Sequence, residues 1–149
     1  MKYAAIFLTL VFLAGAACAG YLWLTCDVSA VSSGVVAREA AADPELFASL
    51  KAAHGDEITG DISGYVFYTW SVKITNSTFV DIEQAECRLS LLPGDVCQVP
   101  AADSPGIPAR SEGTLTVTAL TRVNTTPVRE ATVSWYLWGH PAFAPLTLH

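Results

Sequence analysis

The stretch "GYVFYTWSVKITNSTF", residues 64–79, decides the fold class of this chain. Large apolar side chains occupy alternate positions in it, at Val66, Tyr68, Trp70, Val72 and Ile74. Successive side chains of a β-strand point to opposite faces of a sheet, so this pattern predicts a strand over about residues 65–75 with one face in a core. The opposite face carries Tyr65 and Phe67, although solvated sheet faces are usually polar.

The same period of two recurs along the rest of the chain. It predicts further strands at about residues 81–92, 96–99, 114–121 and 129–138, and a short one near 143–148. A "PGD" turn at residues 93–95 and a loop rich in Pro, Gly and Ser at 100–113 separate them. We therefore predict a mainly β chain whose antiparallel β-sandwich occupies residues 58–149.

A segment without charged side chains, residues 3–26, precedes this domain. About 20 apolar residues suffice to cross a bilayer, and Lys2 ahead of the segment favours an amino terminus in the cytoplasm. We therefore predict a signal anchor over residues 1–26 of a single-pass cell-membrane protein, with an extracytoplasmic carboxy-terminal domain. Two alternatives stay open: cleavage after "ACA" at residues 17–19, and lipid attachment at Cys18, where "LAGAAC" resembles a bacterial lipobox.

Residues 27–57 are predicted to form a juxtamembrane segment. Its first part, residues 27–42, is only weakly periodic and is interpreted as a tether or as a continuation of the anchor helix. The stretch "DPELFASLKAAHG" then predicts a short helix, in which Asp43 caps the amino end and Pro44 takes the first position. Its apolar side must be buried on the domain or on a partner, because so short a helix is not stable alone. That side consists of Leu46, Phe47, Leu50 and Ala53.

Charge is distributed unevenly along the chain. Of eight basic residues only Lys2 precedes residue 27, whereas all 14 acidic residues lie at or after residue 27, so the predicted external part carries 7 − 14 = −7 charges. A negative field of this size opposes binding to the phosphate backbone of nucleic acids. We therefore expect no nucleic-acid partner.

Few residues of the sequence offer catalytic or metal-binding chemistry. The three histidines lack metal-ligand spacing, and no phosphate-binding loop or nucleophile motif occurs. We therefore predict a protein without enzymatic activity and without a cofactor or metal. Cys87 and Cys97 flank the "PGD" turn of an exported domain and are predicted to form a disulfide, the alternative being two buried free thiols.

Two further groups of residues leave alternatives open. Asn76 in "NST" and Asn124 in "NTT" match the glycosylation pattern but also suit turns. The outward aromatic side chains of two strands lie either beneath the helix of residues 44–53, which we favour, or on a surface that binds a partner. These aromatic residues are Tyr65, Phe67, Tyr136 and Trp138.

A family resemblance extends over about residues 64–139. The stretches "WSVKITNSTFVDIEQAECRLSLL", "IPARSEGTLTVTAL" and "REATVSWYLWG" resemble small immunoglobulin-like domains of bacterial envelope proteins, including the FxLYD and LEA14-like groups. The resemblance implies an immunoglobulin-like sandwich with a binding, scaffold or accessory role and a protein partner in the envelope. Two alternatives stay open: a ligand-binding lipoprotein or small enzyme with a loop site, and a subunit whose anchor packs through "AGAACAG" at residues 14–20.

Overall fold

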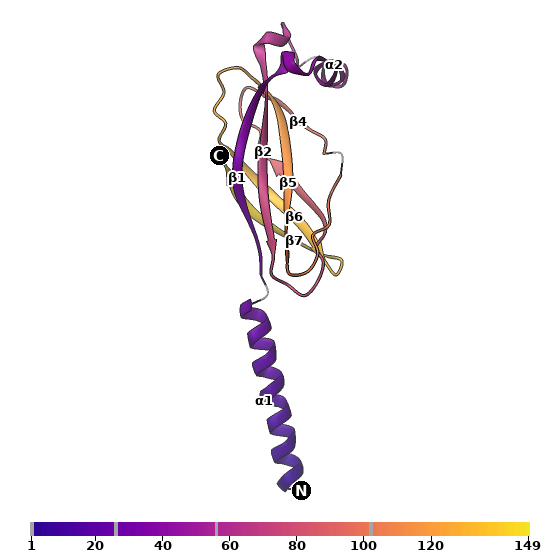
Figure 1. Cartoon of the computed structure of the whole chain (residues 1–149), viewed down its shortest axis with the longest axis vertical. Coiled ribbons are helices and arrows are strands. Elements are labelled where there is room, and N and C mark those ends of the chain that lie inside the picture. Colours follow the sequence, from indigo (N-terminus) through magenta and orange to yellow (C-terminus); the bar gives the residue numbers. More distant parts are fainter. Residues whose placement is uncertain (1, 26, 56, 102) are drawn as a thin grey trace.

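Two antiparallel β-sheets form the domain that follows an amino-terminal helix (Figure 1). The computed structural model describes residues 2–25, 27–55, 57–101 and 103–149. The helices are α1 (Lys2–Thr25) and α2 (Pro44–Ala53), and the strands are β1 (Val28–Glu39), β2 (Tyr65–Asn76), β3 (Glu83–Leu89), β4 (Asp95–Val99), β5 (Ser111–Arg122), β6 (Arg129–Leu137) and β7 (His140–Leu148). Their order is β1-β2-β5-β4 in one sheet and β3-β6-β7 in the other. The prediction of a mainly β, two-sheet antiparallel fold with one short helix is thereby confirmed.

The main core lies between the two sheets. Trp70, Val72 and Ile74 of β2 are fully buried there against Leu115 of β5 and Val133 of β6. Each fully buried aliphatic side chain of this size contributes about 1.5–3 kcal/mol to folding. The alternating face of the opening stretch is therefore a core face from Tyr68 to Ile74, whereas Val66 is only half-buried and belongs to neither core.

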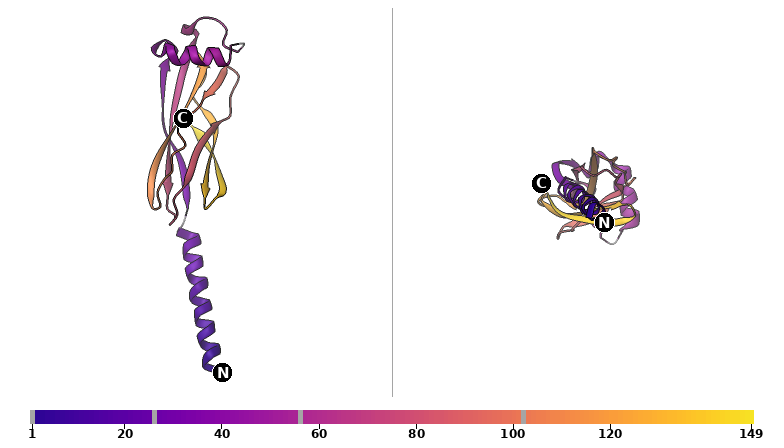
Figure 2. Two further views of the ribbon diagram at one scale, coloured as in Figure 1. Left: turned by 90° about the vertical axis from the view of Figure 1, so that its right-hand side faces the viewer. Right: turned by 90° about the horizontal axis from the view of Figure 1, so that it is seen from below.

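A second, smaller core lies on the outer face of the first sheet, under α2. Phe67 and Tyr65 of β2 are buried there with Phe47 and Leu50 of the helix, and the Phe47 and Tyr65 rings are 5.5 Å apart. Figures 1 and 2 show α2 across the end of the domain far from α1. The helix covers Tyr65 and Phe67, as expected, so these two side chains do not form a partner surface.

The predicted start of the sandwich at residue 58 is wrong, because residues 28–39 form β1 rather than a tether or a helix. β1 pairs with β2 along its whole length, from Val28↔Asn76 to Glu39↔Val66. β1 lies at a sheet edge, and its side chains are mostly small. Few of them are buried, so the sequence shows only a weak alternation of apolar and polar residues. Backbone pairing with β2, rather than side-chain burial, places this segment in the sandwich.

The predicted disulfide between Cys87 and Cys97 is absent, and both are free thiols in the structure. Cys87 lies in the core between the sheets, whereas Cys97 lies on the outer face of the first sheet beside Leu120. The turn at residues 93–95 carries the chain from one sheet to the other instead of forming a hairpin. Sequence proximity therefore does not bring the two sulfur atoms together.

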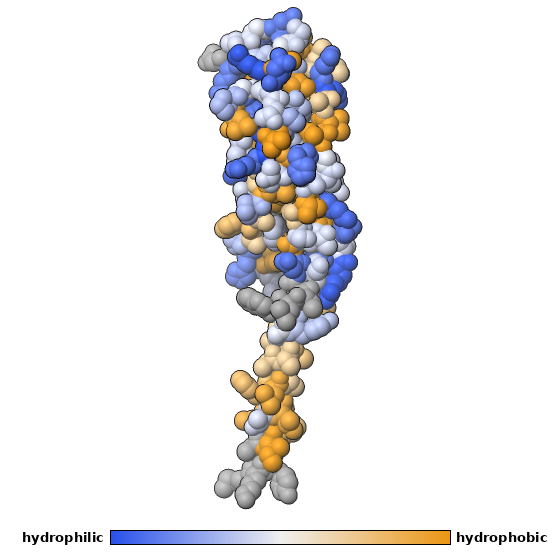
Figure 3. Space-filling model, turned by 90° about the vertical axis from the view of Figure 1, so that its left-hand side faces the viewer, coloured by the Kyte–Doolittle hydropathy of each residue, from blue (hydrophilic) through white to orange (hydrophobic). Residues whose placement is uncertain are grey.

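The amino-terminal helix α1 extends away from the sandwich (Figures 1 and 3). Its side chains at residues 6–21 are exposed, and most of them are apolar. The described residues contain no helix that combines the length and the apolarity needed to cross a membrane.

Candidate functional site

The sandwich is closed along one side and open along the other. On the closed side, the Ser32 hydroxyl donates to the His149 carbonyl over 3.1 Å, which joins β1 to the end of β7. On the open side, β4 is short and pairs with β5 only between Thr118 and Thr121. Within the described residues, the edge of β5 at positions 111–117 therefore has no partner strand on this side.

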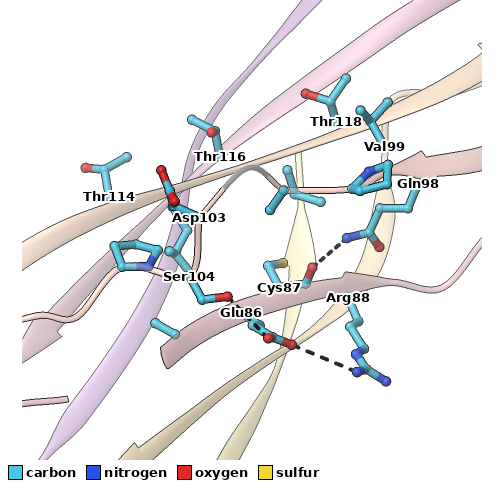
Figure 4. Close-up of a pocket in the computed structure, with 16 residues that line it drawn as sticks. Glu86, Cys87, Arg88, Gln98, Val99, Asp103, Ser104, Thr114, Thr116 and Thr118 are labelled. Carbon is cyan, nitrogen blue, oxygen red and sulfur yellow. Dashed lines mark hydrogen bonds and ion pairs between the residues drawn. The ribbon is translucent and has the colours of Figure 1, made fainter. Parts of the chain in front are cut away.

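A cavity of about 560 Å³ lies at this open side, between β3, β5 and the loop that follows β4 (Figure 4). Its volume falls within the range of about 300–1,000 Å³ that is typical of ligand sites. Hydroxyl and carboxylate groups from three parts of the chain converge on it. The polar lining includes Thr114, Thr116 and Thr118 of β5, Glu86 and Arg88 of β3, and Asp103 and Ser104 of the loop.

The side chain of Gln98 holds the two sheets together above the cavity. Its Nε2 donates to the Cys87 carbonyl over 2.7 Å, and its Oε1 accepts from the Leu89 N–H over 2.9 Å. At the other end, the Ala85 N–H donates to the Pro105 carbonyl over 3.1 Å. Hydrogen bonds to β3 therefore fix both ends of the cavity, which we call the window.

Polar contacts within the window are few and leave most groups available to a ligand. The Ser104 hydroxyl donates to Glu86 over 3.2 Å, and Arg88 lies 3.9 Å from the same carboxylate. The side chain of Arg88 is 82% exposed and that of Glu86 is 47% exposed. This arrangement suits a ligand that offers hydrogen-bond donors to the carboxylates and hydroxyls of the window.

Both buried thiols have raised pKa values. Burial raises the pKa of Cys87 to about 11, and burial together with the negative charge of Glu57 raises the pKa of Cys97. Thiols that stay protonated near neutral pH are poor nucleophiles and poor metal ligands. Over the described part of the chain, no cluster of side chains is suited to holding a metal ion.

We expect the raised pKa of Cys87 to reduce stability at alkaline pH. The unfolded thiol ionises near pH 9.0 and the folded one only near pH 11, so the free energy of unfolding falls across this window. The linked loss is about 2 kcal/mol at the upper end. Urea unfolding of the full chain in detergent, compared with Cys87→Ala across this window, measures it. Equal losses in both proteins would contradict the prediction.

An exposed aromatic patch lies on the second sheet. Tyr136, Trp138 and Phe143 are 40%, 79% and 75% exposed, respectively. Tyr136 pairs with Pro141 and Phe143 pairs with Ser134, so their side chains are diagonal neighbours on the outer face. We call these three residues the hairpin patch. The expectation that α2 covers Tyr136 and Trp138 is wrong, because α2 packs on the other sheet.

Trp138 occupies an unusual backbone position. It and Gly139 form the two-residue turn between β6 and β7, with φ values of +52° and +71°. Such turns favour Asn-Gly, because bulky side chains rarely adopt positive φ. Phe143, the third member of the patch, was not singled out from the sequence, although its position on the predicted terminal strand signals it.

We therefore expect Trp138→Asn to stabilise the domain by about 1 kcal/mol, through relief of left-handed backbone strain. Denaturant unfolding of the full chain in detergent measures this difference. Trp138→Ala, which keeps a side chain with no preference for positive φ, is the control and should change stability much less. A large loss of stability in either variant would place Trp138 in a packed environment and contradict its exposure.

Asn76, one of the two glycosylation candidates, belongs to the interior. It is 1% exposed, and its Nδ2 lies 2.8 Å from the Val80 carbonyl and 3.0 Å from the Pro108 carbonyl. Its Oδ1 accepts from the Thr78 hydroxyl over 2.7 Å. These bonds fix the loops at the end of the sandwich nearest α1. Asn124, in contrast, is exposed in a turn with a φ of +72°.

A buried ion pair that the sequence did not reveal joins the two sheets at the other end. Arg129 Nε and Nη2 donate to the Asp95 carboxylate over 2.8 and 2.5 Å, and both side chains are 0% exposed. Burial raises the pKa of Asp95, but hydrogen bonds from Arg129 and the Leu92 N–H, with the Arg129 charge, outweigh it and lower the pKa overall. In the sequence, Asp95 is indistinguishable from an ordinary turn residue.

Comparison with known proteins finds similarity to solved structures but no match to a family model or a curated protein. Among solved structures, it is similar to the cupredoxin domain of amoB from Nitrosocaldus yellowstonii. The TM-score is 0.33 and the sequence identity 11%, over 83% of this chain and 82% of that chain. A similarity at this level supports no conclusion about fold family or function.

Proposed function

We propose that the protein is a membrane-anchored, extracytoplasmic binding module with an immunoglobulin-like fold and no catalytic activity. The strand order supports the fold assignment. Constant-type immunoglobulin domains place strands A-B-E-D opposite C-F-G, and β1-β2-β5-β4 opposite β3-β6-β7 is the same order. The sequence resemblance over residues 64–139 points to the same fold and to the bacterial envelope.

Residues 3–26 are the proposed anchor. In the sequence, these 24 residues carry no charged side chain, and about 20 apolar residues suffice to cross a bilayer core. Exposed apolar side chains such as Ile6, Leu10 and Phe12 would otherwise face water. Lys2 before the segment favours an external domain.

The unpaired edge of β5 beside the cavity is the observation that carries the proposed binding role. An exposed strand edge can bind an extended polypeptide through main-chain hydrogen bonds, while neighbouring side chains provide specificity. The carboxylates of Glu86 and Asp103 lie at the same window. We infer an extended segment of a partner protein that carries a basic side chain.

Photocrosslinking in native membranes tests this role. A photoreactive residue at Thr116, on the β5 edge, should attach to one partner protein identified by mass spectrometry, and Asp103→Lys should reduce the yield. Thr132, which is also exposed and lies on β6 of the other sheet, is the matched control position. Equal labelling at Thr132, or no adduct at Thr116, would contradict the proposal. Release of the protein from membranes by alkaline carbonate would contradict the anchor.

A further inference from the structure

The hairpin patch lies at the end of the sandwich nearest α1. β1 begins at this end, where Val28 pairs with Asn76, and Tyr136 pairs with Glu83 at the start of β3. Figures 1 and 2 show the hairpin between β6 and β7 at this end of the domain. Exposed aromatic residues therefore gather where the domain meets its proposed anchor.

A second loop at this end also presents an aromatic side chain. Phe79, in the connection between β2 and β3, is 58% exposed. The guanidinium carbon of Arg110 lies 4.0 Å from the centre of its ring. An aromatic ring with a cation above it combines an apolar body with a group that stays in polar surroundings. Two separate loops thus share the same amphipathic character.

The short connection to α1 limits how far this end can lie from a membrane. Only three Cα–Cα steps separate Thr25 from Val28, which reach about 11 Å at most. The headgroup region is about 5–8 Å thick on each side of the hydrocarbon core. An anchor helix ending at the edge of this core therefore holds the loops at or beside the headgroups.

We propose that the hairpin patch and Phe79 dock into the headgroup region of the bilayer and fix the orientation of the domain on the membrane. This inference rests on the proposed anchor. Trp and Tyr are enriched at that depth, because their rings are amphipathic. Trp138 is exposed and has an unfavourable positive φ, so it does not serve the folding of the domain. A bulky aromatic residue at such a position fits a role in contact with an external surface. A docked patch would present the open β5 edge sideways, toward neighbouring proteins.

Lipid quenching of Trp138 in the full chain tests docking. The protein is reconstituted into zwitterionic vesicles with or without lipids brominated near the glycerol end of the acyl chains. The emission difference between the natural protein and Trp138→Phe isolates Trp138 from the other tryptophans. We expect brominated lipids to remove most of this emission. Unquenched Trp138 emission would overturn the inference and favour a protein partner for the patch.

A matched control places tryptophan elsewhere on the surface. Val36 is 67% exposed and lies about 26 Å further along β1 than Val28. The emission that Val36→Trp adds to the Trp138→Phe protein, taken as the difference between the two, should be left unchanged by brominated lipids, and quenching of this difference would overturn the inference. Vesicle flotation after an alkaline wash separates the two proposals: a protein that does not float contradicts the anchor, whereas a floating protein with unquenched Trp138 contradicts docking alone.

Discussion

Asp95→Asn is expected to destabilise the domain by about 3–5 kcal/mol, because it leaves the Arg129 guanidinium charged in a fully buried site. The carboxylate accepts from Arg129 and from the Leu92 N–H, and the asparagine amide cannot match this set of bonds. Chemical unfolding of the full chain in detergent measures the loss. Because the folded pKa of Asp95 is lowered, its contribution is present above the ordinary carboxyl pKa and is lost as pH falls through the lowered value.

The double variant Asp95→Leu, Arg129→Met is the control for this prediction. Replacing both members of a buried ion pair with apolar residues is often neutral or stabilising by about 1–4 kcal/mol. We expect the double variant to be far more stable than Asp95→Asn. If the two lose equal stability, the cost arises from the shape of the site rather than from an unpaired charge.

Phe67→Ala is expected to destabilise the domain by about 3–5 kcal/mol, because it empties the centre of the core between α2 and the first sheet. Phe67 is 0% exposed, with Leu120 opposite it on β5. The thermal unfolding midpoint of the full chain, together with helix content, measures the effect. Loss of α2 contacts should also increase amide exchange in residues 44–53.

Phe143→Ala provides the matched control, since Phe143 is the same residue type and is 75% exposed. Surface substitutions usually change stability by less than about 0.5 kcal/mol. A small effect for Phe67→Ala would mean that α2 detaches from the sheet in solution. Tyr65 and Phe67 would then become candidates for partner binding again.

Periodicity predicted the strands that place a run of alternate side chains in the main core. β2, β5 and β6 bury alternate side chains in the main core, so their positions in the sequence are clear. The helix cap was also predicted correctly, because the Asp43 side chain accepts a hydrogen bond from the Leu46 N–H. β1 was not predicted, because an edge strand of small residues is held by backbone pairing with a strand far along the chain. Such pairing leaves no pattern in the residues of β1 itself.

Long-range placement accounts for what the sequence did not predict about the site. The cavity depends on how far β4 pairs along β5, which is a matter of register and not of residue type. Cys87 and Cys97 are close in sequence but lie on different layers. The ion pair joins positions 34 residues apart, each of which resembles an ordinary polar residue at a strand end.

The pairing of β1 with β2 has a mechanical consequence for a tethered protein. A pull between the proposed anchor and an attachment further from the membrane would enter the domain at Val28 and act along the axis of β1. The hydrogen bonds of an antiparallel pair are perpendicular to the strands, so this load would shear them together along the whole β1–β2 interface. The domain would therefore transmit tension between the membrane and that attachment without its first strand being peeled away bond by bond.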